Sequence, residues 1–585
     1  MDIRGIRLHR HPAIDFSALA LSLVAAFLFL HLAGARAERL AIPVAKPRFN
    51  ADSAFLTARM LSTNFGSRVT GAPGTHNSAA YIAARFTALR LATSTQEFPI
   101  EVKSAPLTGR NVIGRSSGSA PGTIVLVAHY DGQPTSDQSA GDNASGIGVL
   151  LELARTLEQR GHHHPITYVA TDAAEWGMVG ARVFAASLEP RQVVAAISFD
   201  HVENGTGKAV RILGEGQDGD DYAPMWLRRA AGNAFAAEGV RTIDIGTLEE
   251  WIHRVLGITL TDQGRFVQRD IAAIDLDVLS NRPEYARFLY HTPGDRWETL
   301  KPVSFQLLGA GAERLVLALD EAPAPAPHGP VHYLGLGDER MATGFWILLA
   351  AIALFVPLVI AVWEAWQAAA ADPASRRAIQ SELVRAGGWW LIGIAGLLAV
   401  WAAVAVGLLP DYEGAPATVR DPFLYSTQWV PVVATLLVMA LVALLLGAMR
   451  KRPGLMLSHP LAGRAAALST LLAVVILTLV HNPFAAVWLL VLPAWLWLWI
   501  GPSHRPLTGA TGALIALASA APVVVAIAVL GQPLGLGAGI LWYLFLQVAY
   551  VSWSPLTVVM AVVMVLAAFR LVGTATARLI PAEGD

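Results

Sequence analysis

The stretch from Thr123 to Gly146 combines the pattern of a buried strand with side chains that bind metal ions. Its apolar run, Ile124 to Ala128, predicts a strand buried in a sheet. His129 follows that run directly, and Asp131 and Asp142 come next among glycines. Because α/β sheets open their ligand crevices at the carboxyl ends of such strands, this arrangement predicts the metal site of a hydrolase.

Three more candidate ligands follow apolar segments or lie in turn-like motifs further along the chain. Glu175 lies in TDAAEWG, Asp200 ends ISFD, and His291 lies in YHTPGD. Each alone is weak evidence, but nitrogen and oxygen ligands without sulfur together favour zinc or a similar divalent ion. The five candidate ligands are thus His129, Asp142, Glu175, Asp200 and His291. If one carboxylate among them bridges two ions, each ion has three ligands and room for water.

The elements that must position these residues belong to a globular segment from about Arg48 to Asp320. Strand-like and helix-like patterns alternate there without a long apolar run, which predicts an α/β fold with a mixed, largely parallel sheet. The expected strands are Thr95–Val102, Asn111–Gly114, Thr123–Ala128, Ile166–Thr171 and Val194–Phe199. The expected helices are Ser53–Met60, Asn77–Leu91, Gly146–Gln159, Val179–Ala186 and Val303–Leu319.

Composition places part of the remaining chain in a membrane. The chain has 585 residues, of which 54% are hydrophobic and 15% charged, so it is too apolar for a single soluble enzyme. The absence of cysteine excludes disulfides, thiolate metal ligands and a cysteine nucleophile. A net charge of -1 and the lack of a basic patch give no indication of nucleic-acid binding.

The N-terminal segment predicts a membrane anchor. Ser17 to Ala35 contains no charged residue and is about long enough to span a bilayer. Arg4, Arg7 and Arg10 precede it and should stay in the cytoplasm, so the domain that follows would be exported. The triplet Ala35-Arg36-Ala37 also matches a signal-peptidase site, but we expect the anchor to be retained.

After Met341 the chain consists mainly of apolar runs, which predict an all-α bundle of about eight transmembrane helices. These runs are Thr343–Trp363, Trp389–Leu409, Trp429–Met449, Ala465–Val480, Pro483–Ile500, Gly512–Leu530, Leu536–Val551 and Leu556–Val572. Basic loops such as the one with Arg376 and Arg377 should lie inside, so the globular domain should face the non-cytoplasmic side. Ionisable residues lie near the ends of the runs, which favours an anchor or packing platform over a transport pathway.

These patterns divide the chain into four parts. Residues 1–35 form a cytoplasmic tail and transmembrane signal anchor, and residues 36–320 form the exported domain. Residues 321–340 form a Pro/Ala linker, and residues 341–585 form the multi-spanning domain. The expected partners are a peptide and the lipid bilayer, while the sequence leaves the oligomeric state open.

The motifs VAHYDG, GDNASG, TDAAEWG, SFDH and YHTPGD occur in the order and at the spacings of the dizinc exopeptidases of clan MH. Over about half its length the chain therefore resembles this family of bacterial leucyl aminopeptidases, aminopeptidase Y and glutamate carboxypeptidase. The resemblance implies that Asp142 bridges two zinc ions. It assigns His129 and Asp200 to one ion, and Glu175 and His291 to the other.

The resemblance also implies roles for residues beside the ligands. Asp131 matches the carboxylate that orients the first histidine, and Tyr290 resembles a tyrosine that in some members stabilises the tetrahedral oxyanion. Thr261-Asp262-Gln263 with Phe266 is similar to a segment beside the substrate pocket. The whole architecture is similar to multi-spanning vacuolar and endoplasmic-reticulum metallopeptidases and their bacterial relatives. It implies a bacterial inner-membrane protein with residues 36–340 in the periplasm.

One position departs from the family pattern. Active members carry two consecutive glutamates, a general base followed by a zinc ligand, and here that pair reads Ala174-Glu175. A general base contributes roughly 10²- to 10⁴-fold to the rate, so its loss predicts impaired catalysis with metal binding intact. The sequence therefore predicts an aminopeptidase-like metallopeptidase acting on exported peptides. The alternative is a pseudopeptidase that serves as a zinc-stabilised peptide-binding or scaffolding protein.

Asp172 is the nearest carboxylate that could replace the missing base. We expect it instead to cap the N-terminus of a helix, a common role for aspartate.

Overall fold

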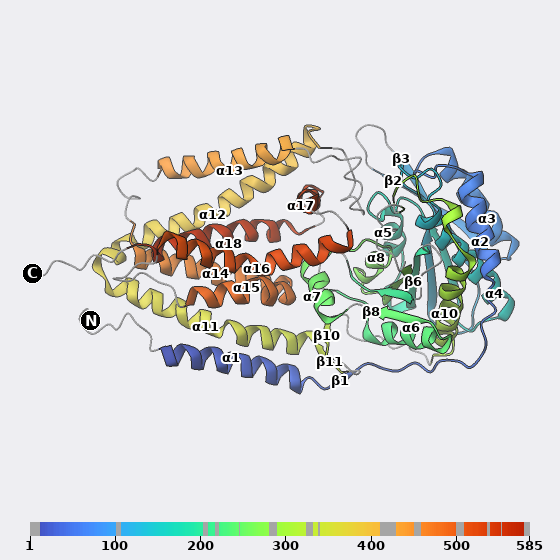
Figure 1. Ribbon diagram of the computed structural model, residues 1–585, viewed down its shortest axis with the longest axis horizontal. Helices are drawn as coiled ribbons and strands as arrows, with labels where there is room; N and C mark the ends of the chain where they lie inside the picture. The colour runs from blue at the N-terminus through green and yellow to red at the C-terminus, as the bar shows by residue number, and fades with distance from the viewer. Residues whose placement is uncertain are drawn as a thin grey trace, which may run out of the picture.

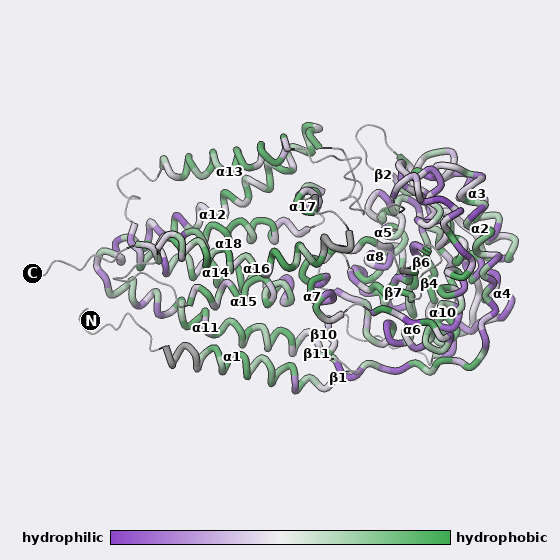
Figure 2. The backbone as a smooth tube through the Cα atoms, in the orientation of Figure 1, coloured by the Kyte–Doolittle hydropathy of each residue, from purple (hydrophilic) through white to green (hydrophobic). Residues whose placement is uncertain are grey.

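The computed structural model describes residues 12–100, 107–202, 209–216, 221–244, 246–279, 289, 291–322, 332–336, 340–409, 429–449, 458–498, 508–534, 539–550 and 553–577. In these ranges the chain forms an α/β domain at one end of an elongated molecule and a bundle of long helices at the other (Figure 1). The bundle is mostly hydrophobic along its helices, whereas hydrophilic residues concentrate on the α/β domain (Figure 2).

An eight-stranded mixed sheet forms the centre of the α/β domain, in the order β2-β3-β5-β4-β6-β9-β7-β8. Its strands are β2 (Ala92–Ile100), β3 (Leu107–Arg115), β4 (Thr123–His129), β5 (Ile166–Thr171), β6 (Val193–Val202), β7 (Ala209–Leu213), β8 (Arg241–Asp244) and β9 (Ala273–Leu279). The central strands β5, β4, β6 and β9 are parallel to one another. β3 and β7 pair antiparallel with this central group on either side. The predicted fold class of this domain is confirmed.

Helices cover both faces of the sheet. They are α2 (Ala51–Asn64), α3 (Pro73–Ala88), α4 (Ser145–Arg160), α5 (Val179–Ala186), α6 (Met225–Ala237), α8 (Gln263–Val267) and α10 (Pro302–Asp320), whereas α7 (Thr247–Leu256) packs on the bundle. Ile124 and Leu126 of β4 belong to the same hydrophobic cluster as residues of α2, α4 and α10. Val125 and Val127 point to the opposite face and share a cluster with Phe184 of α5. Burial on both faces explains why the apolar run in β4 is unbroken.

Every helix and strand expected between Ser53 and Leu319 is present, with ends that differ by a few residues. The sequence interpretation omitted β7, β8 and β9 and the helices α6, α7 and α8. Among these, β9 completes the parallel centre beside β6, and α7 forms the contact with the bundle described below.

Each of the eight apolar runs after Met341 coincides with a helix. These helices are α11 (Gly344–Ala371), α12 (Pro373–Ala405), α13 (Trp429–Met449), α14 (Pro460–His481), α15 (Pro483–Leu498), α16 (Gly509–Leu534), α17 (Gly539–Ala549) and α18 (Pro555–Ala575). In the described part of the chain, α11, α12, α13, α14, α16 and α18 are long and apolar enough to cross a membrane. α14 lies at the centre of the bundle, in contact with α11, α12, α15 and α18.

A small three-stranded sheet joins the two segments of the chain that connect the α/β domain to the bundle. β1 (Ala35–Arg36), which follows α1 (Pro12–Leu32), pairs with β11 (Arg340–Thr343), and β11 pairs with β10 (Tyr333–Gly335). α1 and α11 then run side by side away from this sheet (Figure 1). Part of the segment expected as a linker, 321–340, is thus strand, and its Ala-Pro portion at 323–330 lies outside the described residues.

The α/β domain contacts the bundle through α7. The indole nitrogen of Trp251 donates to the carbonyl of Phe484 at 3.2 Å. Asn482 donates from Nδ2 to the carbonyl of Arg254 at 2.6 Å, and the indole of Trp553 donates to the carbonyl of Leu256 at 2.8 Å. The last two bonds satisfy carbonyls of the final turn of α7, which have no partner within the helix.

Candidate metal centre

The five predicted ligands converge at the carboxyl ends of the central parallel strands. His129 is the last residue of β4, and Asp200 lies near the end of β6. Glu175 lies in the turn that follows β5, and Asp142 lies in the loop that precedes α4. His291 comes from the loop between β9 and α10. Segments that are more than 150 residues apart in sequence, such as those of His129 and His291, therefore meet at one edge of the sheet.

The carboxylate of Asp142 lies between the two histidines. Its Oδ1 is 3.0 Å from Nε2 of His129, and its Oδ2 is 2.6 Å from Nε2 of His291. On the first side, His129 Nε2 is also 3.5 Å from Oδ1 of Asp200. On the second side, His291 Nε2 is 3.4 Å from Oε1 of Glu175. Each oxygen of Asp142 thus belongs to a different half of the cluster, and each half contains one histidine and one further carboxylate.

Hydrogen bonds from neighbouring residues fix the orientation of these side chains. Asp131 lies 3.4 Å from Nδ1 of His129 and accepts the backbone N–H groups of Ala174 at 3.1 Å and Glu175 at 3.2 Å. It therefore links the end of β4 to the turn that carries Glu175. The side-chain amide of Gln133 donates to Oε2 of Glu175 at 2.5 Å, which leaves Oε1 directed toward His291. In metal sites, hydrogen bonds of this kind orient the side chains that bind the ion.

The loop that contains Asp142 is held at both ends by residues that the sequence interpretation did not single out. Asp295 accepts the backbone N–H of Gly141 at 2.6 Å and that of Asp142 at 3.1 Å. Arg68, which is fully buried, donates to the carbonyls of Tyr130, Gln138 and Ser139. Asp295 could have been found as the last residue of YHTPGD, whereas nothing local in the sequence marks Arg68.

Charge in the buried cluster is balanced between histidines and carboxylates. Burial opposes charge on His129, but its contacts with Asp131, Asp142 and Asp200 raise its pKa well above the ordinary value. Burial opposes charge on His291 as well, and there Glu175 and Asp142 raise the pKa. Although burial favours protonation of Asp142, the two histidines hold its pKa well below the ordinary range. Two protonated histidines thus supply positive charge that a divalent cation could supply in their place.

The donor set fits such a cation. Oε1 of Glu175 and Oδ1 of Asp200 are buried, and neither accepts a hydrogen bond from any residue that the structure describes. A buried carboxylate oxygen without a hydrogen-bond partner lowers the stability of the fold, so a cation bound beside each of these two oxygens would be stabilising. His129, Asp142 and Glu175 could hold one metal ion, and Asp142, Asp200 and His201 form a second group with ligand spacing. His201 follows Asp200 in SFDH and was not among the predicted ligands.

Asp172, the carboxylate considered as a replacement for the family's general base, accepts hydrogen bonds at both of its oxygens. Its Oδ1 accepts from the hydroxyl of Thr70 at 2.9 Å and from the backbone N–H of Ala173 at 2.8 Å, and its Oδ2 accepts the N–H of Arg110 at 3.0 Å. Both oxygens are therefore engaged within the fold. Burial, with Asp131 nearby, raises the pKa of Asp172 to about 7. The expectation that it caps a helix was wrong, because α5 begins only at Val179.

The residues expected beside the substrate pocket lie in different surroundings. Asp262 is buried and accepts the hydroxyl of Thr171 at 2.6 Å, which places it under the end of β5. Phe266 packs against Phe184 in the core. Tyr290, the predicted oxyanion donor, lies outside the described residues. Ala174 is almost fully buried, and its methyl group can neither accept nor donate a proton.

Comparison with known proteins agrees with the motifs. Residues 111–316 match the model of peptidase family M28. The alkaline phosphatase isozyme conversion protein of Escherichia coli (strain K12) is 34% identical over 152 residues, which are 22% of this chain and 44% of that protein. Aminopeptidase YwaD of Bacillus subtilis (strain 168) is 24% identical over 224 residues, 37% of this chain and 46% of that protein.

Among solved structures, BSAP, a zinc aminopeptidase from Bacillus subtilis, has 16% identity and a TM-score of 0.41, covering 49% of this chain and 98% of its own. The chain spans less than half the length of the two curated relatives above. The match to the family confirms the resemblance predicted from the motifs.

Proposed function

We propose that this chain, whose α/β domain belongs to the clan MH peptidase family M28, is a membrane-anchored dizinc exopeptidase that removes N-terminal residues from exported peptides. The observation that carries the proposal is the shared carboxylate of Asp142. One of its oxygens lies 3.0 Å from His129 and the other 2.6 Å from His291. A carboxylate placed in this way between two histidines is what a two-metal site requires.

In this proposal each zinc ion has three protein ligands. His129, Asp200 and Asp142 would hold one ion, and Glu175, His291 and Asp142 would hold the other. When bound, the ions would polarise the scissile carbonyl and lower the pKa of water. Asp131 orients His129 through its Nδ1, and Gln133 orients Glu175 through its Oε2. Tyr290 is proposed to donate a hydrogen bond to the developing oxyanion.

Ala174 makes the proposed enzyme slow. No carboxylate is present at this position to take the proton from the attacking water, and the two oxygens of Asp172 are engaged elsewhere. Activity therefore depends on positioning and on the metal ions, at roughly 10²- to 10⁴-fold below that of an intact relative. A peptide-binding protein without turnover would use the same cluster, and direct measurement of turnover separates the two functions.

The proposed location is the inner membrane of a bacterium, with residues 36–340 in the periplasm. Within the described ranges, six helices are long and apolar enough to cross a membrane. The turn between α11 and α12 lies at the end of the bundle opposite to the α/β domain (Figure 1), and Arg376 and Arg377 follow it directly. Arginine-rich connections are retained in the cytoplasm, which puts the α/β domain on the other side.

Metal content and peptide release test the function together. The purified protein should contain about two zinc ions and release N-terminal residues from unblocked peptides slowly, and a chelator should abolish that release. Asp142→Asn should lose both metal and activity, while Asp52→Asn, on the exposed start of α2, should keep both. Protein without zinc would refute the metallopeptidase, and zinc-loaded protein with no turnover would favour the pseudopeptidase.

A further inference from the structure

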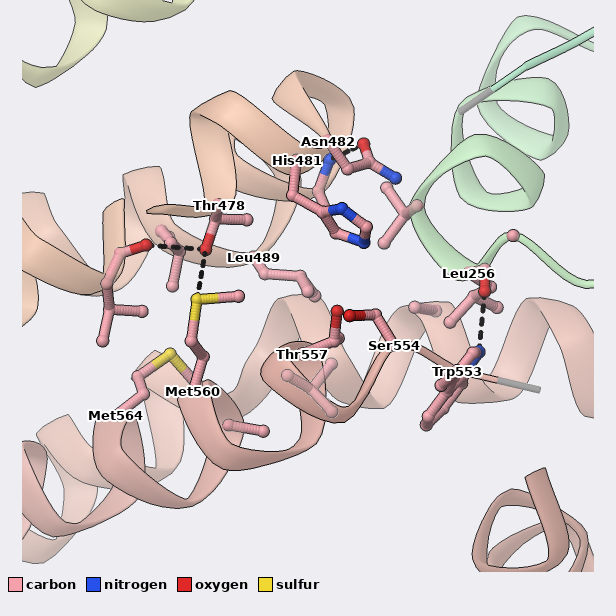
Figure 3. Close-up of a pocket in the computed structure, with 18 of the residues that line it drawn as sticks. Leu256, Thr478, His481, Asn482, Leu489, Trp553, Ser554, Thr557, Met560 and Met564 are labelled. Carbon is pink, nitrogen blue, oxygen red and sulfur yellow. Dashed lines mark hydrogen bonds between the residues drawn. The ribbon is translucent and has the colours of Figure 1, made fainter. Parts of the chain in front are cut away.

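A cavity of about 260 Å³ lies where the bundle meets α7 (Figure 3), and the residues that line it do not belong to the metal cluster. Its walls come from α14, α15, α16, α17 and α18, and its roof comes from the end of α7. At the roof, Leu256 is held by the hydrogen bond from the indole of Trp553 to its carbonyl. Ile258 and Tyr543 pack with these residues into a small hydrophobic cluster above the cavity. The cavity is thus a pocket of the membrane domain that the α/β domain helps to close.

The polar groups of the cavity are concentrated near the roof. His481, Asn482, Ser554 and Thr557 lie there, while Met564 lies at a deeper level of α18 (Figure 3). The hydroxyls of Ser554 and Thr557 form no hydrogen bond with another described residue and are drawn toward the interior of the pocket. They are the donors that an occupant's polar group would meet.

The deeper part of the cavity offers only apolar surface. Thr478 reaches it, but its hydroxyl is already bonded to the carbonyl of Val474 at 2.7 Å and contacts the sulfur of Met560 at 3.7 Å. Met564 lies ten positions after Ser554, the residue that precedes α18, so the lining extends about 15 Å along this helix. The remaining walls at this depth include Leu490 and side chains of similar character.

Three kinds of molecule could occupy such a cavity: a charged solute, a peptide segment or a hydrocarbon chain. These features exclude the first two. A charged solute would require a charged partner, and none of the described residues that line the cavity is Asp, Glu, Lys or Arg. A peptide segment would bring backbone N–H and C=O groups, and the deep walls provide no free partner for them. An unbranched hydrocarbon chain requires neither a charged partner nor a hydrogen-bond partner along its length. A polar group at its end can remain beside Ser554 and Thr557.

We propose that this cavity binds one acyl chain of a membrane phospholipid, with the uncharged ester group of that chain at the roof beside Ser554 and Thr557. A phospholipid is the source of such a chain that surrounds this site, because α16 and α18 expose apolar side chains such as Leu517, Val524 and Phe569 on their outer surfaces. The proposal rests on the membrane location given above and does not depend on peptidase activity. The bound chain would fill the space beneath Leu256 and so support the contact between α7 and the bundle.

Retention of lipid by the detergent-purified full chain tests the proposal. After exhaustive detergent exchange, native mass spectrometry should find about one phospholipid per chain. Ala526→Phe on α16 and Ala561→Phe on α18 each fill the cavity from a different wall and should lower retention about tenfold. Ala443→Phe on α13 adds the same ring to an exposed membrane-facing position and should leave retention unchanged.

A second measurement does not depend on any variant. A phospholipid with a photoreactive acyl chain, reconstituted with the unaltered protein, should label Met560 and Met564 above the level found on α13. The proposal is overturned if the unaltered protein retains no lipid, if both cavity variants retain as much as the control, or if the retained molecule is a free fatty acid or a peptide. Zinc content should be the same in all variants, whereas loss of zinc in the unaltered protein would instead refute the proposed function.

Discussion

At the metal cluster, the role of each residue depends on which atom of its neighbour it reaches. Asp131 and Asp142 both contact His129, but Asp131 approaches Nδ1 and Asp142 approaches Nε2. Only Nε2 faces Asp200 and the centre of the cluster, so Asp131 can orient the ring, whereas Asp142 is the carboxylate proposed to share a metal ion with it. Sequence spacing alone places both carboxylates near the histidine and does not separate these roles.

Ala174→Glu should restore a general base. We expect its turnover of an unblocked peptide to exceed that of the natural sequence by about 10²-fold or more, because a carboxylate next to Glu175 could accept the proton of the attacking water. Zinc content should stay the same, since no predicted ligand is altered. The measurement is the initial rate at saturating zinc for both proteins.

Ala174→Gln is the matched control for this substitution. It adds a side chain of the same length that cannot accept a proton, so its rate should remain near that of the natural sequence. Equal gains from Glu and Gln would mean that bulk at position 174, rather than proton transfer, limits the reaction. Equal rates for all three proteins would show that the base lies elsewhere.

The five residues of the cluster could be singled out from the sequence because each directly follows an apolar run or lies in a compact motif. Gln133, Arg68 and Asp295 could not be assigned roles in this way. Their partners are 42 to 154 residues away in sequence, and several are backbone atoms with no side-chain signature. The position of Ala174 was visible only as a departure from a motif, because an alanine in isolation carries no chemical signal.

At the scale of elements, α7 and the segment after it connect the bundle to the metal cluster. α7 ends at Leu256, which the indole of Trp553 holds against the membrane domain. Six residues later Asp262 accepts a hydrogen bond from Thr171 at the end of β5. The sequence interpretation omitted α7 although Ile252 and Val255 have helical spacing. Part of its apolar surface packs on α15 and α16 rather than on the sheet. A helix at this position was therefore not needed to account for the core of the α/β domain.

Asn482 should be important for this docking. It begins α15 by accepting the N–H of Ala485 at 2.8 Å and also donates to the carbonyl of Arg254 at 2.6 Å. Asn482→Ala loses both bonds, so we expect a cost of about 2 kcal/mol and faster hydrogen exchange in α7. Asn482→Asp keeps the acceptor that caps α15 and loses only the donor, so it should show faster exchange in α7 with a smaller loss of stability. Unchanged exchange in both variants would contradict a docking role.

The ion pair between α7 and the loop after β7 should make stability depend on pH. Burial opposes charge on His253, but Glu215 at 3.7 Å raises its pKa above the ordinary 6.5. Burial also opposes charge on Glu215, and His253 nevertheless lowers its pKa below 4.5. The raised pKa of His253 contributes stability that is complete below pH 6.5 and is lost as the pH rises through the folded-state value. The lowered pKa of Glu215 contributes stability above pH 4.5 that is lost as the pH falls.

Both contributions are present between pH 4.5 and 6.5, so His253→Gln should lower the thermal midpoint most in that window. We expect a larger difference from the natural sequence at about pH 5.5 than at about pH 8.5, measured by thermal unfolding. The two proteins share the metal cluster, so its own pH dependence cancels in this difference. Glu215→Gln should reduce the same difference, and a gap that is constant with pH would refute the pairing.

At the scale of the whole molecule, the chain leaves the bundle after α1 and returns to it before α11 at the same end. β1 and β11 pair at that point, and α1 and α11 run together from it. The eight helices after Met341 could be predicted because each is a continuous apolar run, which hydropathy alone identifies. Their packing around α14 could not, because apolar runs carry no pattern that distinguishes a neighbouring helix from lipid.

The orientation of the molecule in the membrane can be tested by labelling single introduced cysteines, because the sequence itself contains no cysteine. Ser187→Cys places a thiol on the exposed end of α5 in the α/β domain, and Ala374→Cys places one at the exposed turn between α11 and α12. A membrane-impermeant maleimide should label Ser187→Cys in intact spheroplasts and should label Ala374→Cys only after lysis. We expect the arginines beside Ala374 to keep that turn in the cytoplasm, and the α/β domain lies at the opposite end of the bundle (Figure 1). Labelling of Ala374→Cys before lysis, with Ser187→Cys protected, would reverse the orientation and place the metal cluster in the cytoplasm.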